Sequence, residues 1–164
     1  MQATRIELLQ QMPVFGALRE DSLHQLLEHT RSVAVAAGEF FFRENHQAAS
    51  MYVLEAGRVS VIKTWQGRDF VLHNLAAGDC FGEMALMDLF PRSASVRADA
   101  HCRAIELAAT DLLRLFERDA EQFALIQMNI GREVCRRLRT TDELLFRASM
   151  GETTAQPQTL FRSA

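Results

Sequence analysis

Cysteine and proline are scarce in this sequence, and neither forms a pattern. The chain contains three cysteines and three prolines. Cys80, Cys102 and Cys135 are widely separated and odd in number, which excludes a disulfide framework and provides no zinc-ligand spacing. We therefore expect reduced structural thiols and no bound metal.

Long hydrophobic runs are also absent. No segment approaches the roughly 18 consecutive apolar residues of a membrane-spanning helix. The sequence does not open with the basic segment and apolar stretch of a secretion signal. We expect no membrane partner and a cytoplasmic location.

The chain has no strong excess of one charge. Its net charge is -3, and its sequence pI is near 6.0, so nothing draws it generally toward nucleic acid or an anionic membrane. A locally basic stretch near the C-terminal end alternates with acids, which is typical of a solvated helix face; it comprises Arg132, Arg136, Arg137 and Arg139 with Glu133 and Glu143.

A catalytic arrangement is missing as well. The five histidines, scattered along the chain, lie in no nucleophile or zinc motif, so we expect them to be surface or structural residues. We predict no catalytic residue, no cofactor and no enzyme activity. A phosphodiesterase, for example, would need metal ligands or an activated water.

The composition and patterning of the chain predict one domain over 1–148 and a disordered tail over 149–164. Hydrophobic residues make up 48% of the 164 residues, enough for a sizeable core. Helical patterning in 1–30, over 5–11 and 19–29, is followed by short alternating runs in 31–107 and by helices in 109–148. The fold class is mainly β with flanking helices, a β jelly-roll sandwich.

Seven strands are predicted within the β region. Glycines and other turn residues punctuate them about every ten positions. The segment 65–68 is predicted to form a hairpin tip in which Trp65 packs across the turn. The strands are expected at 32–36, 39–43, 50–55, 58–64, 69–75, 95–99 and 102–106.

Two helices are predicted after the strands. Thr110 is expected to cap the first, over 111–118. The second, over about 120–148, carries an apolar stripe that either packs on the sandwich or pairs two chains in a parallel dimer. The stripe consists of Phe123, Ile126, Ile130, Val134, Leu138, Thr141 and Leu145.

The most informative segment is FGEMALMDLFPRSASVRA at 81–98, in which Glu83 precedes Arg92 and Ser93 by nine and ten positions. A short helix is expected after Gly82, and its free N–H groups suit a phosphate. Arg92 provides a planar charged fork and Ser93 a hydroxyl donor. A phosphate repels the Glu83 carboxylate unless that carboxylate accepts a hydrogen bond from a donor such as a sugar hydroxyl. This combination favours a 3′,5′-cyclic nucleotide, which leaves the 2′-hydroxyl free.

At these residues the sequence resembles the cyclic nucleotide-binding domain family, whose cassette reads F-G-E-apolar-small-L and then P-R-small-A-S/T-V. The resemblance covers about residues 10–147. It implies that Glu83 binds the ribose 2′-hydroxyl and that Arg92 and Ser93 bind the phosphate of cyclic AMP or cyclic GMP. The remaining cassette residues assigned to the ligand site are Phe81, Gly82, Met84, Ala85 and Ala94.

The resemblance also implies contacts from the long helix. Thr141 matches a threonine that contacts the base in catabolite-activator-like members, although its alternative role is to bond back to its own helix. Asp142 replaces a serine that makes a second base contact across a dimer. By strand position, Val61, Leu72, Leu75 and Phe81 line the pocket, though they equally suit a plain core. Such relatives carry a helix-turn-helix after this helix; none follows here, so no direct DNA binding is expected.

Three functions are compatible with these features. The first is a cyclic nucleotide sensor that moves its long helix, forms a homodimer and acts on an unidentified effector protein. The second is a ligand-independent dimerisation or scaffold domain with a vestigial pocket. The third is a cyclic dinucleotide-binding variant, which needs a second basic group such as Arg97 or Arg103.

Overall fold

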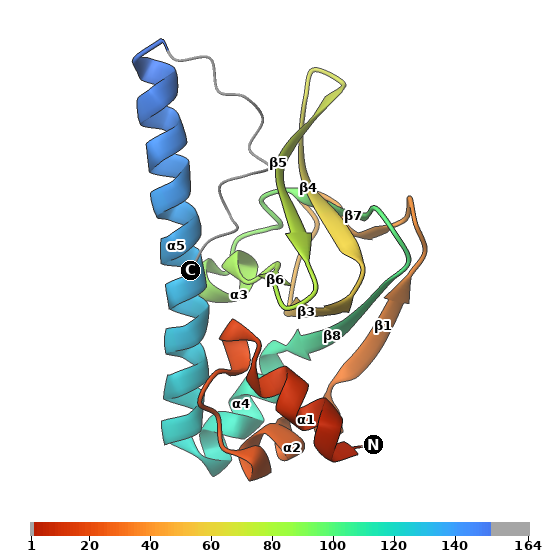
Figure 1. Ribbon diagram of the computed structural model, residues 1–164, viewed down its shortest axis with the longest axis vertical. Coiled ribbons are helices and arrows are strands. Elements are labelled where there is room, and N and C mark those ends of the chain that lie inside the picture. Colours follow the sequence, from red (N-terminus) through yellow and green to blue (C-terminus); the bar gives the residue numbers. More distant parts are fainter. Residues whose placement is uncertain (1, 152–164) are drawn as a thin grey trace.

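The protein is a two-sheet sandwich with helices at one end and one long helix beside it (Figure 1). The computed structural model describes residues 2–151. Two helices and a helical turn come first, namely α1 (Gln2–Gln10), η1 (Pro13–Phe15) and α2 (Glu20–His29). Eight strands follow: β1 (Arg31–Val35), β2 (Phe40–Phe42), β3 (Ser50–Ala56), β4 (Arg58–Trp65), β5 (Arg68–Ala76), β6 (Cys80–Phe81), β7 (Ser95–Ala98) and β8 (Cys102–Ala108). Helix α3 (Met84–Asp88) lies between β6 and β7, and α4 (Ala109–Arg118) and α5 (Ala120–Ser149) complete the order.

The strands form two antiparallel four-stranded sheets. One has the order β1-β8-β3-β6 and the other β2-β7-β4-β5. The predicted class, a β jelly-roll sandwich with N-terminal helices and a long C-terminal helix, is confirmed. Each of the seven predicted strands is present; β6 was missed because two residues are too few for an alternating pattern.

Two local predictions were wrong. Thr110 does not cap α4, because the helix begins at Ala109 and the Asp111 carboxylate accepts the cap hydrogen bond from the Ala108 N–H at 2.9 Å. Trp65 does not pack across its turn: its side chain is 69% exposed at the tip of the β4–β5 hairpin. The hairpin itself is as expected, with positive φ angles at Gln66 and Gly67.

The core has two parts that meet at β3. Successive side chains of a strand point to opposite faces. Met51 and Val53 therefore pack with the helices, while Tyr52 and Leu54 pack inside the sandwich. This strand is buried on both faces and joins the helical layer to the β-roll.

The N-terminal helices hold the first part of α5. The Arg19 N–H donates to Gln122 Oε1 at 2.7 Å, and Asn129 Nδ2 donates to the carbonyls of Val14 at 3.2 Å and Gly16 at 2.8 Å. Ile126 and Ile130 are buried in the same layer. Beyond this region α5 continues alongside the sandwich, far past the helical layer (Figure 1).

The predicted apolar stripe of α5 divides between two faces. Ile126 and Ile130 are buried, but Leu138 and Leu145 are 58% and 65% exposed. The reason is geometric: each step of four residues overshoots one turn by about 40°, so three steps bring Leu138 about 120° around the helix from Ile126. The second face is a separate stripe at alternating steps of three and four, which we call the outer stripe: Met128, Gly131, Cys135, Leu138, Asp142 and Leu145.

Within residues 2–151, no helix is both long enough and apolar enough to cross a membrane. Helix α5 ends at Ser149, one residue inside the predicted tail. The rest of that prediction, from residue 152 onward, lies outside the described residues.

Candidate functional site

A cavity of about 520 Å³ lies between the cassette, strands of the β-roll and α5. We call it the cassette cavity. Most of the residues assigned to the ligand site from the sequence line it, although they come from separate elements: Val61, Leu72, Phe81, Gly82, Glu83, Met84, Ala85, Arg92, Ser93, Ala94 and Thr141.

Two assigned residues do not line the cavity. Leu75 is buried in the sandwich core, the alternative that its strand position left open. Asp142 is exposed on the outer stripe of α5. Its expected base contact across a dimer stays a prediction.

The structure adds lining residues that sequence reasoning missed: Phe42, Lys63, His73, Val96, Val134, Arg137 and Leu138. A β-bulge explains one of them. Val61 pairs with His73 and Ile62 with Val71, so Leu72 is an extra residue without a partner on β4. Because a bulge re-aims the side chains around it, the neighbouring residues Leu72 and His73 both line the cavity.

Arg92 is a buried cation that forms no ion pair with a carboxylate of the described residues. Only 5% of its surface is exposed. Nη1 donates to the Gly82 carbonyl at 2.9 Å, and the guanidinium lies 3.9 Å from the centre of the Phe42 ring. No carboxylate pairs with it among the described residues, and its Nε has no hydrogen-bond partner there. Burial lowers the pKa of Arg92 and outweighs Tyr52, Glu106 and Glu83, which act to raise it, so its charge is under-solvated and a bound anion would stabilise it.

Gly82 provides the close approach that Arg92 needs. Its φ is +78°, and a Cβ built at this position would lie 2.4 Å from Arg92 Nη1 and 3.2 Å from the Phe42 ring. Glycine is therefore required here for two reasons, the backbone angle and the space.

Glu83 is held by an arginine from α5. Arg137 Nη1 donates to Glu83 Oε1 at 2.9 Å, and Arg137 Nη2 donates to the Cys80 carbonyl. The two side chains are 17% and 5% exposed, so this is a largely buried ion pair. Burial acts to lower the pKa of Arg137, but Glu83 and the other negative groups nearby outweigh it and raise the pKa. The pair ties the long helix to the cassette.

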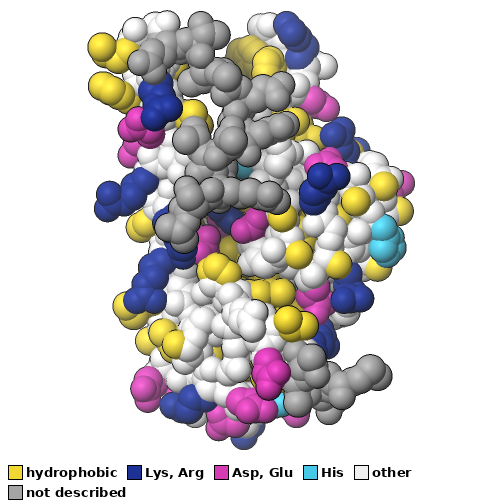
Figure 2. Space-filling model, viewed as in Figure 1, with side chains coloured by type: hydrophobic (Ala, Val, Ile, Leu, Met, Phe, Trp, Pro, Cys, Tyr) yellow, Lys and Arg dark blue, Asp and Glu magenta, His cyan; other side chains and the backbone are white. Residues whose placement is uncertain are grey.

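The position of Arg137 corrects the interpretation of the basic stretch. Figure 2 shows basic side chains spaced along the edge that α5 forms, with acidic and hydrophobic side chains between them. Arg132, Arg136 and Arg139 are exposed, as expected for a solvated face. Arg137 faces the cavity instead.

Three other polar residues of the cavity, Lys63, Ser93 and Thr141, are exposed to solvent. Lys63 pairs with Glu44 at 2.5 Å and donates to the Ser93 carbonyl at 2.8 Å, so its charge is already balanced. Ser93 is exposed, and its hydroxyl donates to the Met84 sulfur at 3.8 Å. The Thr141 hydroxyl donates to the Arg137 carbonyl at 3.0 Å, the alternative role foreseen for it.

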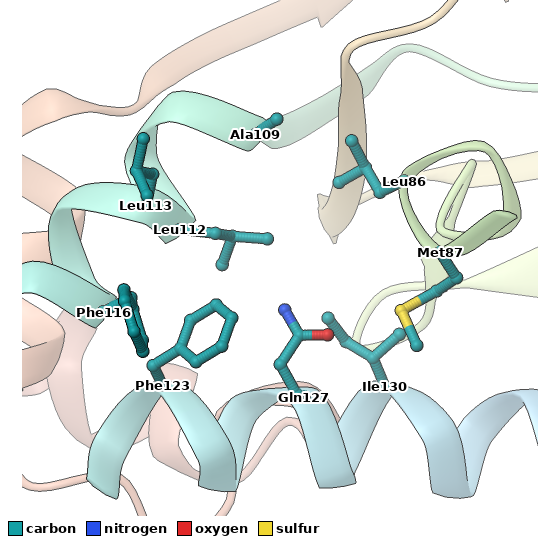
Figure 3. Close-up of a pocket in the computed structure, with 9 residues that line it drawn as sticks. All are labelled: Leu86, Met87, Ala109, Leu112, Leu113, Phe116, Phe123, Gln127 and Ile130. Atoms are coloured by element: carbon teal, nitrogen blue, oxygen red, sulfur yellow. The ribbon is translucent and has the colours of Figure 1, made fainter. Parts of the chain in front are cut away.

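A second cavity, of about 330 Å³, separates α3 from α4 and α5 (Figure 3). Leu86 and Met87 of α3 face Ile130 across it, and Leu112 and Phe123 close another side. Its walls are almost entirely apolar. The cassette helix therefore has a cavity on each of two sides: Met84 and Ala85 line the cassette cavity, and Leu86 and Met87 line the second cavity.

Fold and site together define a family. Residues 32–119 match the cyclic nucleotide-binding domain, and the chain belongs to this family. Gly82, Glu83 and Arg92, which line the cassette cavity, lie within the matched segment, whereas Arg137 lies beyond its end.

Named relatives are regulators. The cAMP-dependent protein kinase regulatory subunit of Blastocladiella emersonii is 31% identical over 108 residues, which is 65% of this chain and 27% of the relative. The cyclic AMP receptor protein of Thermus thermophilus is 28% identical over 135 residues, 79% of this chain and 59% of the relative. The chain thus spans only part of the length of either protein.

Solved structures agree with the fold. The crystal structure of the Thermus thermophilus catabolite activator protein superposes with a TM-score of 0.72 at 28% identity, covering 84% of this chain and 63% of that one. The jelly-roll architecture and the long helix are thus those of a known group of regulatory proteins.

The tight contact at Gly82 gives a first prediction. Gly82→Ala should weaken cyclic nucleotide binding at least about tenfold, or about 1.4 kcal/mol, because its Cβ displaces Arg92. Isothermal titration calorimetry measures the change. The matched control is Gly38→Ala, where φ is +89° and a Cβ meets nothing within 4 Å. Both variants carry backbone strain of about 1–2 kcal/mol, so equal loss of affinity in the two would contradict the role of the contact.

Proposed function

We propose that this protein is a cyclic nucleotide sensor, with cyclic AMP as its principal ligand, that passes the binding event to α5. It belongs to a regulatory family, and we infer no catalytic role. The single observation that carries the proposal is a buried, unpaired Arg92 in the same cavity as a Glu83 already neutralised by Arg137.

The charges of the cavity suit a monoanion. Glu83 with Arg137 is neutral, as is Lys63 with Glu44, which leaves the one positive charge of Arg92. One cyclic phosphate would balance it, whereas a triphosphate would bring several negative charges beside Glu83. The ribose 2′-hydroxyl can donate to Glu83, whose carboxylate keeps an oxygen beyond the one that Arg137 binds.

The coupling to α5 would pass through the ion pair. When the 2′-hydroxyl donates to Glu83 and the base meets Thr141, the ligand contacts the cassette and the helix together. The second cavity leaves room for Leu86 and Met87 to move as the cassette closes on the phosphate. The helix then responds because its closed position has the higher affinity for ligand.

We propose that α5 also pairs two copies of the chain. The support is the outer stripe, whose steps of three and four match a parallel coiled pair and leave Leu138 and Leu145 largely exposed. The partners would be the cyclic nucleotide, a second copy and an effector protein; direct DNA reading is not part of the proposal.

The other two functions have less support. In a scaffold with a vestigial pocket, the buried, unpaired Arg92 would have no function, although burying its charge costs folding free energy. A cyclic dinucleotide needs a second free cation, but Arg97 pairs with Asp99 at 3.6 Å and Arg103 with Glu55 at 3.4 Å. Neither arginine lines the cassette cavity.

The direct test is titration of ligand-stripped protein with cyclic AMP and cyclic GMP. Arg92→Ala should weaken binding of either by about 2–5 kcal/mol, because the phosphate loses its buried partner. Arg97→Ala, outside the cavity, is the control and should bind as the unaltered protein does. If Arg92→Ala binds with unchanged affinity, Arg92 does not bind the phosphate. If the unaltered protein binds neither ligand, it is not a cyclic nucleotide sensor.

A further prediction concerns the sugar. Glu83→Gln should reduce the preference for cyclic AMP over its 2′-deoxy analogue, because a neutral amide accepts more weakly from the hydroxyl. Calorimetry with both ligands measures the ratio of the two affinities. Glu44→Gln serves as the control, because Glu44 pairs with Lys63 and does not itself line the cavity. If the ratio is the same in both variants and in the unaltered protein, Glu83 does not read the ribose.

A further inference from the structure

His73 lines the cassette cavity, but the proposed contacts with the phosphate, ribose and base do not involve it. It is on β5 opposite Val61, beside the bulge at Leu72, and it is partly buried. The bulge aims it at the space that a ligand would fill, so its imidazole is in a position to meet a bound molecule.

The charged groups that line the cavity with His73 come from several elements, and Arg137 acts on it directly. Helix α5 contributes Arg137, the cassette contributes Glu83 and Arg92, and β4 contributes Lys63, which is paired with Glu44. Asp79 and Glu133 act on Arg137 from outside the cavity. The net charge facing the imidazole within the cavity is positive as long as no anion is bound.

We propose that His73 is a ligand-binding residue, neutral in the ligand-free cavity and positively charged when an anionic cyclic nucleotide is bound. This inference rests on the proposed function and extends it to a second cationic contact, one that appears with the ligand. The proton comes from solvent.

The direction of the effect follows from the surroundings. Burial lowers the pKa of His73, and the positive charge of Arg137 lowers it further. The imidazole is therefore neutral near pH 7 without ligand. A bound anion acts in the opposite direction and raises the pKa, so binding takes up a proton. Affinity should rise as the pH falls through the pKa of the bound state and level off below the pKa of the free state.

The test measures cyclic AMP binding between pH 8 and pH 5.5. One linked proton changes affinity by at most about tenfold per pH unit, and we expect a gain of about three- to tenfold from pH 8 to pH 6 in the unaltered protein. His73→Gln, which stays neutral, should change by less than about twofold over the same range. His101→Gln, on an exposed loop, is the matched control and should keep the full dependence.

Calorimetry of the unaltered protein gives an independent measurement. Titrations in two non-phosphate buffers of different ionisation enthalpy report the number of protons taken up, which should lie between zero and one at pH 6.5. This result needs no variant to fold. Zero uptake, or the same pH profile in His73→Gln and the unaltered protein, would overturn the inference while the sensor stands. Absence of binding at every pH would reject the sensor as well.

Discussion

The ion pair between Glu83 and Arg137 joins the cassette to the long helix α5. Removing one partner of a buried pair leaves an uncompensated charge, which typically costs about 3–5 kcal/mol. The far half of α5, beyond its anchors at Gln122 and Asn129, is thereby fastened to the cassette at the carboxylate that we propose binds the ribose. A ligand hydroxyl that donates to Glu83 would therefore affect the ion pair that holds α5.

Arg92 complements this pair by remaining unbalanced. The guanidinium lies over Phe42, near Tyr52, and bonds one carbonyl, and no acid of the described residues forms an ion pair with it. Such a group is expensive to bury and is stabilised by an anion of the right size. Gly82 permits this arrangement because nothing larger fits beneath the guanidinium. This arrangement is the basis of our proposal that the cassette binds one negative charge.

The sequence allowed the sheets and the cassette to be predicted because both depend on local patterns. Alternation reveals β4 and β5, and the contiguous residues around Glu83 and Arg92 carry their own chemistry. Arg137 could not be found in this way: it is separated from Glu83 by 54 residues and lies in a run of arginines whose other members face solvent. His73 was not predicted as a lining residue because a β-bulge directs its side chain toward the cavity, and the alternation of residue types gives no sign of that bulge. Side chains placed by tertiary contacts or by irregular backbone need the structure.

The central claim is that ligand reaches α5 through the Glu83–Arg137 contact. Hydrogen–deuterium exchange along residues 134–149, with and without saturating cyclic AMP, tests it in the unaltered protein and in Arg137→Gln. We expect the ligand to increase the protection of this segment in the unaltered protein, and the increase to be lost in Arg137→Gln even at concentrations that saturate the variant. Equal protection in both proteins, or none in either, would contradict the account.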